Sequence, residues 1–201
     1  MSGRNIWDER YAAEGFAYGT EPNDFLRHNI QLLPAGGRIL CLAEGEGRNG
    51  VFLARHGFEV VAVDSSATGL EKARNLAREH GVQLTTQVVD LANFDIAEAS
   101  FDGVVSIFCH LPPAVRSPLH QKVVRGLKPG GRLILEGYTP DQLELGTGGP
   151  PARELMLTLD ILKKEFSALQ QLHGIELERE VVEGRLHTGT GAVVQFIAEK
   201  N

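Results

Sequence analysis

The chain has few of the residues that would place it in a disulfide-stabilised, metal-binding or membrane class. Its 201 residues include two cysteines, Cys41 and Cys109, which lie far apart and form neither a CxxC motif nor a disulfide framework. The seven histidines are scattered without an HxxxH pair, so we expect no metal site. No apolar run approaches the ~20 residues of a membrane-spanning helix, and the charged first residues do not resemble a secretory signal. We expect a cytoplasmic protein without a membrane partner.

The net charge and the length of the chain indicate which partners it binds and how many domains it forms. The formal net charge is −6, which argues against a general nucleic-acid-binding surface. A chain of 201 residues with 42% hydrophobic and 23% charged residues suits one domain with a sizeable core. We expect a single domain, with residues 1–35 as an N-terminal helical cover and residues 36–201 as the core. The expected partner is a small molecule, and the expected state is a monomer or a weak homodimer.

The most informative stretch runs from residue 38 to residue 57. Residues 39–42 form a short apolar run, which is typical of a strand buried on both faces. A loop of small residues follows, in which Gly45 and Gly47 let the backbone turn sharply and approach a ligand closely. A helical pattern then begins at Val51 and stops at Gly57. This strand, loop and helix indicate the nucleotide-binding turn of an α/β sheet.

Two classes of cofactor bind at such a turn. The segment 45–50 matches the dinucleotide fingerprint G-x-G-x-x-G, and Asp64 follows where the acid of that motif stands. The side chains favour a different ligand, because Glu44 and Glu46 would repel a dianionic pyrophosphate. A cationic ligand with a sulfonium and an amino group fits better, which describes S-adenosylmethionine. A purely structural turn with exposed acids is the remaining alternative.

Apolar runs and helical patterns alternate along most of the chain. Five strand-like runs come first: residues 39–42, 58–63, 82–89, 101–108 and 132–135. Such alternation implies parallel strands joined by right-handed crossovers. Two final runs, 175–182 and 192–198, are expected to pair antiparallel. We expect a doubly wound α/β fold with a mostly parallel seven-stranded sheet and a C-terminal antiparallel hairpin.

Helical patterns also precede the first strand and follow the fifth. A short helix is indicated near Trp7, and a second helix is expected to begin at Pro22 with an apolar stripe facing the core. Residues 139–151 are rich in proline and glycine and are expected to form a loop. A further helix is expected over residues 155–166.

Together these features resemble a class I S-adenosylmethionine-dependent methyltransferase over nearly the whole length. The resemblance rests on the glycine loop, on Asp64 and Asp90 at the ends of the next two strands, on the turn LKPGG at 127–131 and on the terminal hairpin. The segments YGTEPNDFL (18–26) and AEGEGRN (43–49) are similar to the tellurite-resistance and thiopurine methyltransferase-like branch. In that branch an N-terminal segment folds over the cofactor.

Two positions depart from the family pattern. Cys41 stands where the family has an acid, and Ala43 replaces the first glycine of the loop. The departures leave open which group holds the methionine end of the cofactor, and Glu44 is one candidate.

The resemblance implies S-adenosylmethionine as cofactor and assigns it a set of contacts. Asp64 is expected to accept hydrogen bonds from both ribose hydroxyls, and Asp90 with the Leu91 amide to bind the adenine edge. Either acid has a plainer interpretation as a capping or turn residue. Residues 106–108 are expected to form the floor beneath the sulfonium. The full expected set is Ala43, Glu44, Gly45, Gly47, Asn49, Asp64, Ser65, Asp90, Leu91, Ser106, Ile107 and Phe108.

The same resemblance implies methyl transfer to a small-molecule acceptor, for which a thiol or a chalcogen oxyanion is a candidate. A soft anionic nucleophile needs no base, whereas a hydroxyl or an amine needs one. His110 is the best candidate for that base and Tyr18 a weaker one, although His110 could equally cap a turn. Two other functions remain open. One is an NAD(P)-binding oxidoreductase, which would lack the usual Tyr-x-x-x-Lys pair, and the other is a non-catalytic S-adenosylmethionine-binding protein.

Overall fold

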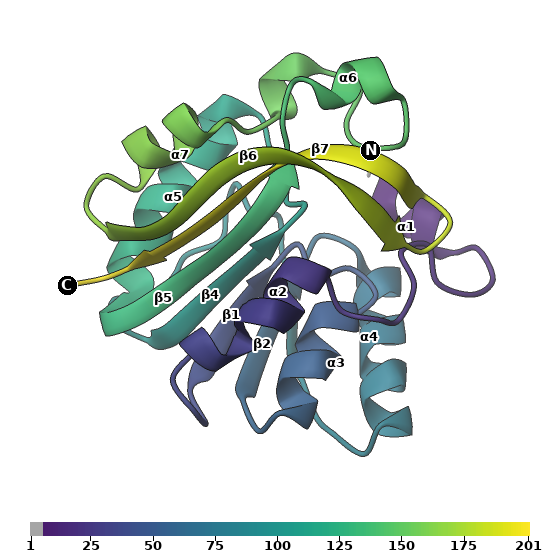
Figure 1. Ribbon diagram of the computed structural model, residues 1–201. Coiled ribbons are helices and arrows are strands. Elements are labelled where there is room, and N and C mark those ends of the chain that lie inside the picture. Colours follow the sequence, from purple (N-terminus) through teal and green to yellow (C-terminus); the bar gives the residue numbers. More distant parts are fainter. Residues whose placement is uncertain (1–5) are drawn as a thin grey trace.

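The computed structural model describes residues 6–201, which are built around one seven-stranded sheet (Figure 1). The strands are β1 (Arg38–Leu42), β2 (Glu59–Asp64), β3 (Thr85–Val88), β4 (Phe101–Ile107), β5 (Leu127–Tyr138), β6 (Gln170–Glu183) and β7 (His187–Glu199). They lie in the order β3-β2-β1-β4-β5-β7-β6. The first five pair in parallel, whereas β7 runs antiparallel to both β5 and β6. The expected doubly wound fold with a C-terminal antiparallel hairpin is confirmed.

Helices cover both faces of this sheet (Figure 1). They are α1 (Ile6–Tyr11), α2 (Asp24–Asn29), α3 (Arg48–Arg55), α4 (Ala67–Glu79), α5 (Pro113–Gly126), α6 (Gln142–Leu145) and α7 (Leu159–Glu165), with 3₁₀ turns at Ile30–Leu32 and Arg153–Leu155. Leu26 of α2 and Leu53 of α3 are buried in one core cluster. Leu119 of α5 and Leu162 of α7 are buried in another. Within residues 6–201, no helix has both the length and the apolar character that crossing a bilayer requires.

The parallel strands bring their carboxyl ends to one edge of the sheet. Leu40 and Cys41 in β1 are both completely buried, because helices pack on either face of a doubly wound sheet. β1 pairs with β2 on one side and with β4 on the other. The segments that follow these three strands therefore begin side by side, at the edge where ligands bind in open α/β sheets.

Two helices begin later than the sequence pattern predicted. The helix expected to start at Pro22 starts at Asp24, because the Asn23 side chain caps it by accepting a backbone hydrogen bond from its first turn at 3.0 Å. The helix expected over residues 155–166 starts at Leu159, after a separate 3₁₀ turn. In both cases a polar cap, rather than the apolar spacing, fixes the helix start.

The strand boundaries near the C-terminus also differ from expectation. The expected turn 127–131 is the first part of β5, where a register shift opposite β4 interrupts the pairing. The runs 175–182 and 192–198 are the middles of longer strands. Gly189 and Gly191, which were expected in the connecting segment, pair with residues of β6. Cross-strand partners thus extend the hairpin through residues of low intrinsic strand preference.

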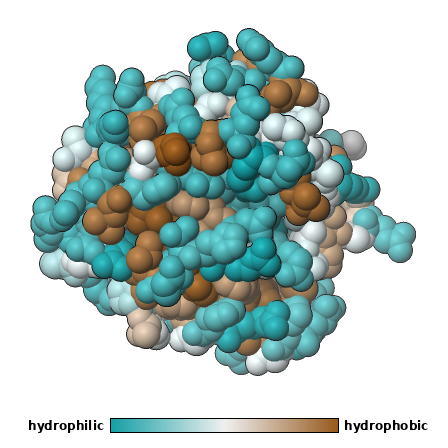
Figure 2. Space-filling view, in the orientation of Figure 1, coloured by the Kyte–Doolittle hydropathy of each residue, from teal (hydrophilic) through white to brown (hydrophobic). Residues whose placement is uncertain are grey.

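β6 is the edge strand of the sheet and is mostly exposed. Leu172, Ile175 and Val182 on this strand are 44–74% exposed. On the face shown in Figure 2, hydrophobic residues stand in separate patches among hydrophilic ones. The edge strand therefore depends on contacts at its ends more than on burial along its length.

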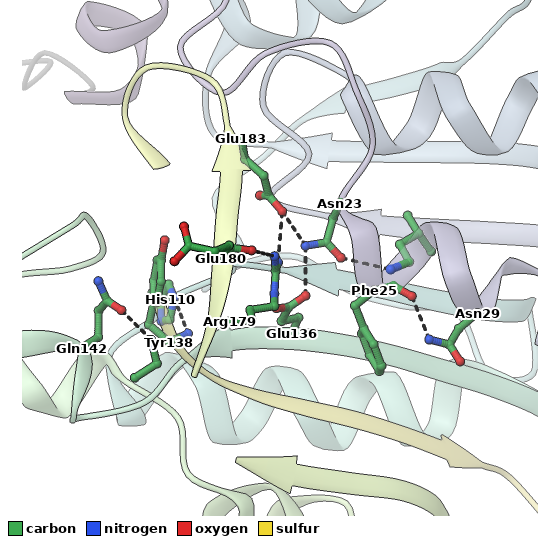
Figure 3. A network of polar contacts seen from close by, with 12 residues as sticks. Asn23, Phe25, Asn29, His110, Glu136, Tyr138, Gln142, Arg179, Glu180 and Glu183 are labelled. Carbon is green, nitrogen blue, oxygen red and sulfur yellow. Dashed lines mark hydrogen bonds and ion pairs between the residues drawn. The ribbon is translucent and has the colours of Figure 1, made fainter. Parts of the chain in front are cut away.

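A buried polar network holds the far end of β6 (Figure 3). The side-chain amide of Asn23 donates to Glu136 at 2.9 Å and to Glu183 at 2.8 Å. Arg179 donates to the same two carboxylates, at 2.6 and 3.2 Å. Arg48 completes the network with a 2.6 Å ion pair to Glu183. These contacts join the N-terminal segment, α3, β5 and β6 at one place.

Candidate active site

The loop after β1 turns through three residues with left-handed backbone. Ala43, Gly45 and Gly47 have φ values of 50°, 62° and 96°. A Cβ on Gly47 would lie 2.6 Å from the Cβ of Ala73 in α4, so this position requires glycine. Ala43 takes the same backbone region with a Cβ, at a cost of about 1 kcal/mol. α3 begins directly afterwards at Arg48, three residues before the start of the apolar pattern.

Asp64 ends β2 at the ligand-binding edge and fixes the turns around it. One carboxylate oxygen accepts a hydrogen bond from the Gly45 amide at 2.9 Å, and the other accepts one from the Ser66 amide at 2.8 Å. Burial raises the pKa of this carboxyl above its usual range, although the amide donors oppose the rise. Each oxygen retains capacity for a further hydrogen bond, so the turn contacts are compatible with the expected ribose contacts. Ser65, also an expected contact, lies next to it and is half-buried.

The two loop acids are already bonded to donors of the protein. Glu44 is buried and accepts a hydrogen bond from the Gly50 amide in α3 at 2.6 Å. Glu46 is buried as well, and accepts from Lys72 Nζ at 2.9 Å and from the Ala17 amide at 2.7 Å. Lys72 balances the charge of Glu46, whereas the donor to Glu44 is a neutral amide, so the sequence argument about repulsion applies more to Glu44 than to Glu46.

Asn49 and Asp90 likewise have structural partners. Asn49 Oδ1 accepts a hydrogen bond from the backbone N–H of Asn23 at 2.9 Å. Because Asn23 caps α2, this contact connects α3 to the start of α2. Asp90 is exposed and accepts a hydrogen bond from the Ala92 amide at 2.9 Å. That contact matches the turn interpretation of Asp90. Leu91, beside it, is buried near the carboxyl end of β3.

The expected floor lies at the end of β4. Ser106 and Ile107 are buried, and Phe108 follows with a φ of 51°. A non-glycine residue with positive φ is uncommon, and such strain concentrates at functional sites. The Phe108 ring centroid lies 4.5 Å from that of Tyr138 and 4.9 Å from that of His187.

His110 lies close to this floor, but both of its ring nitrogens are occupied. Nδ1 is 3.1 Å from the Leu155 carbonyl oxygen, and Nε2 accepts a hydrogen bond from the Tyr138 amide at 3.2 Å. Burial lowers the pKa of His110 to about 4, so the ring is neutral at pH 7. A neutral ring with its proton on Nδ1 satisfies both contacts and has no nitrogen left to accept a proton. The geometry agrees with the turn-capping alternative rather than with the role of a base.

Tyr18 reaches the same region from the N-terminal segment. Its hydroxyl oxygen accepts a hydrogen bond from Arg10 Nη1 at 2.7 Å, and its ring centroid lies 4.5 Å from that of His187. Burial raises the pKa of Tyr18, so its phenol is protonated at pH 7. Tyr18, Phe108, Tyr138 and His187 form what we call the aromatic cluster.

Two residues that the sequence did not single out carry unpaired buried nitrogens. They are Nδ1 of His187 and Nη1 of Arg48, the two buried side-chain polar atoms without a hydrogen-bond partner in residues 6–201. Burial lowers the pKa of His187 to about 4, so the ring is neutral. The sequence held no local signal for His187, because its neighbours Phe108 and Tyr18 are remote along the chain.

The N-terminal segment packs over the glycine loop. Tyr11 of α1 is 5% exposed, and its ring lies against Gly45 and Gly69, where a Cβ on either glycine would meet it at 2.6–2.8 Å. Asp8 accepts hydrogen bonds from the Ser66 hydroxyl at 2.5 Å and from the Thr68 amide at 3.1 Å, at the start of α4. The first five residues of the expected cover, 1–5, lie outside the described residues.

Glu44 predicts a pH dependence of stability. Burial raises its pKa from 4.5 to about 7, against the opposing effect of the Gly50 amide. The folded state therefore holds the proton more tightly than the unfolded state. The resulting stabilisation is full below about pH 4.5 and is lost as pH rises through about 7.

The free energy of unfolding of Glu44→Gln should therefore rise relative to that of the wild type across that pH window, as measured by urea unfolding. The matched control is Glu59→Gln, whose side chain is 62% exposed. A difference between Glu44→Gln and the wild type that stays constant with pH would contradict this account.

Comparisons with known proteins match the part of the chain that carries this geometry. A family model described as "Methyltransferase domain" matches residues 39–131. A carboxy-S-adenosyl-L-methionine synthase from Photobacterium profundum is 33% identical over 134 residues, which cover 65% of this chain and 52% of that protein. A tRNA (uracil(54)-C(5))-methyltransferase from Pyrococcus horikoshii is 28% identical over 139 residues, which cover 61% of this chain and 31% of that protein. The chain thus spans about half, or less, of the length of these relatives.

Solved structures match over nearly the whole chain. A protein solved in a study of the conversion of a disulfide bond into a thioacetal group during echinomycin biosynthesis superposes with a TM-score of 0.77 at 18% identity, covering 98% of this chain and 91% of its own. TehB from Haemophilus influenzae superposes with a TM-score of 0.70 at 16% identity, covering 97% of this chain and 66% of its own. At these identities the likeness establishes the fold. Residues 39–131 are thus similar to a methyltransferase domain, and the matched family model and relatives indicate S-adenosylmethionine as the cofactor.

Proposed function

We propose that the protein transfers a methyl group from S-adenosylmethionine to a small-molecule acceptor with a soft nucleophile, such as a thiol or a chalcogen oxyanion. The observation that carries the proposal is the aromatic cluster at the end of β4, where rings from four separate parts of the chain meet within 4.5–5.4 Å. All four rings come from one chain, and Tyr18 brings the N-terminal segment into contact with His187. A site built from rings of a single chain favours a small acceptor.

The residues at the edge of the sheet fit the cofactor. Gly45 and Gly47 leave the loop without side chains, which lets Tyr11 and Ala73 pack directly against its backbone and holds the turn that the cofactor is proposed to approach. Asp64 retains acceptor capacity for a ribose diol at the end of β2. The cofactor supplies an electrophilic methyl group on a sulfonium. Phe108 stacks on Tyr138 with one face, and the other face of Phe108 carries the negative side of an aromatic quadrupole, which attracts such a cation.

The chain's part in the reaction is to orient the acceptor and to exclude water. In an in-line displacement, a lone pair of the acceptor forms the new bond to carbon while the bond to sulfur breaks, and the positive charge disappears. A thiolate or a chalcogen oxyanion needs no base for this step. His110 offers no free nitrogen. The neutral ring of His187, with a free Nδ1, is the group we propose to contact the acceptor, by accepting a hydrogen bond from a protonated thiol without taking its proton.

The finer assignments rest on narrower support. The tellurite-resistance branch is supported by segments 18–26 and 43–49 and by the likeness in fold to TehB. The net charge of −6 argues against tRNA as acceptor, although one relative is a tRNA methyltransferase. Free Cys41 and Cys109 suit a reducing cytoplasm. An NAD(P)-dependent oxidoreductase and a non-catalytic S-adenosylmethionine-binding protein are the alternatives.

Calorimetry with S-adenosylmethionine, S-adenosylhomocysteine and NAD tests which cofactor binds, and a labelled-methyl screen over thiols, tellurite and selenite tests whether a methyl group is transferred.

Asp64→Ala should weaken S-adenosylhomocysteine binding by about 2–4 kcal/mol, because two charge-assisted hydrogen bonds are lost. Asp102→Ala is the matched control. Asp102 pairs with Lys128 near the start of β4, at the edge of the sheet away from the proposed cofactor site. Tight NAD binding without binding of S-adenosylhomocysteine would favour the oxidoreductase. Cofactor binding without transfer to any acceptor would favour the non-catalytic alternative.

The two histidines should separate in a pH–rate profile with a thiol acceptor. His187→Ala is expected to lower the rate by about 10-fold at pH 7, where most of the thiol is protonated, and by less above the thiol pKa of about 8.5, where no base is needed. His110→Ala should lower thermal stability, because two backbone groups lose their partner, and should keep most of the rate per folded molecule. A loss of about 10²-fold in His110→Ala at every pH would instead make His110 the acid–base group.

We also propose that residues 6–35 act as a cover that closes over the cofactor. Tyr11 against Gly45 and the Asp8 contacts to α4 support it. Amide hydrogens of residues 6–20 should exchange more slowly with S-adenosylhomocysteine bound than without it, and Asp8→Ala should weaken that protection. Equal exchange in the two states would show a static packing segment.

A further inference from the structure

Arg48 has a buried donor that no residue of the described chain satisfies. It is the first residue of α3, and its side chain is almost completely buried. Nη2 donates to Glu183 Oε2 at 2.6 Å, whereas Nη1 has no hydrogen-bond partner in residues 6–201. An unpaired buried N–H on a charged group is unfavourable. A cation at a helix N-terminus is unfavourable as well. The arrangement thus lacks a structural reason for the unused donor.

Glu183 does not serve both nitrogens of Arg48. Its Oε1 accepts from Asn23 at 2.8 Å and from Arg179 at 3.2 Å, and its Oε2 takes Nη2 of Arg48. The charges of the network already balance, because Arg48 and Arg179 face Glu136 and Glu183. Nη1 is therefore an additional donor rather than part of a shared ion pair.

This donor lies beside the aromatic cluster. Glu183 is directly opposite His187 in the β6–β7 ladder, so their side chains share one face of the hairpin. The His187 ring lies 4.5 Å from Tyr18 and 4.9 Å from Phe108. Burial is the main cause of the lowered pKa of His187, and the Arg48 charge lowers it further. Arg48 Nη1 and His187 Nδ1, the two unpaired atoms, thus flank Glu183 at the same end of the site.

We propose that Arg48 binds a carboxylate or an oxyanion at this place. The inference rests on the proposed methyl transfer and adds the chemistry of the ligand group that Arg48 recognises. A guanidinium N–H is a directional, charge-assisted donor suited to such an anion. Two ligands could bring the anion. One is the cofactor, whose amino-acid end carries a carboxylate, and the other is an acidic acceptor.

Arg48→Lys isolates the unused donor. A lysine ammonium keeps the positive charge available to Glu183 but lacks the second terminal nitrogen. Arg116→Lys is the matched control, because Arg116 is equally buried and pairs with Glu165 at 3.2 Å between α5 and α7. Thermal unfolding verifies that both variants are folded.

Calorimetry then compares the binding of S-adenosylhomocysteine with that of 5′-methylthioadenosine, which lacks the amino-acid end. A second series compares selenite and mercaptoacetate with uncharged mercaptoethanol, on protein saturated with S-adenosylhomocysteine.

The pattern of losses identifies the source of the anion. A loss of about 10-fold or more for S-adenosylhomocysteine in Arg48→Lys, with 5′-methylthioadenosine unchanged, assigns Arg48 to the cofactor carboxylate. A similar loss confined to selenite or mercaptoacetate assigns it to the acceptor. The inference is overturned if Arg48→Lys binds every anionic probe as tightly as Arg116→Lys, or if the wild type binds none of them. The proposed function fails on a different result, namely wild-type protein that binds S-adenosylhomocysteine and anions but transfers no methyl group.

Discussion

The buried ion pairs around Asn23 are the constraint on which the arrangement of the site depends. Asn23 and Glu136 are both 0% exposed, and Glu183 is 5% exposed. Charges at such depth are stable only when each has a partner, and removing one partner leaves an uncompensated charge. Three side chains supply those partners: Arg48 from α3, Arg179 from β6 and the side-chain amide of Asn23, which caps α2. The three segments can hold this geometry only together.

The consequence reaches the aromatic cluster through the edge strand. β6 buries few of its side chains, so packing along its length does little to fix the hairpin. Glu183 lies at its end, directly opposite His187. By holding Glu183, the network also sets where the His187 ring stands against Phe108. The position of a residue proposed to contact the acceptor thus depends on the ion pairs that hold Glu183.

Short-range patterns were enough to predict the frame of the molecule. The apolar runs of β1, β2 and β4, the glycine loop and Asp64 at the end of β2 all lie where the sequence indicated, because burial on two faces leaves a local signature. Long-range contacts left none. Arg48 meets Glu183 across 135 positions, and nothing near His187 marks it among seven histidines. The same limit applies to His110. Its ring nitrogens bond to the backbone of Leu155 and Tyr138, which lie 45 and 28 positions away, so the sequence near His110 does not indicate these partners.

The two departures from the family loop have a linked physical explanation. Cys41, which stands where the family has an acid, is completely buried within β1. Its thiol contacts Glu44, and burial together with that carboxylate raises the pKa of the thiol. Glu44 in turn accepts a hydrogen bond from the Gly50 amide inside α3. Glu44 thus places an acid in the loop, where it accepts a hydrogen bond from the first turn of the helix. Holding the loop this way compensates for Ala43, whose left-handed backbone costs what a glycine there would not. The Gly50 amide occupies one acceptor site of Glu44, and the carboxylate keeps further acceptor capacity, as Asp64 does. A carboxylate can bind an ammonium group, whereas an anionic group needs a donor, and the unpaired Nη1 of Arg48 is such a buried donor within residues 6–201.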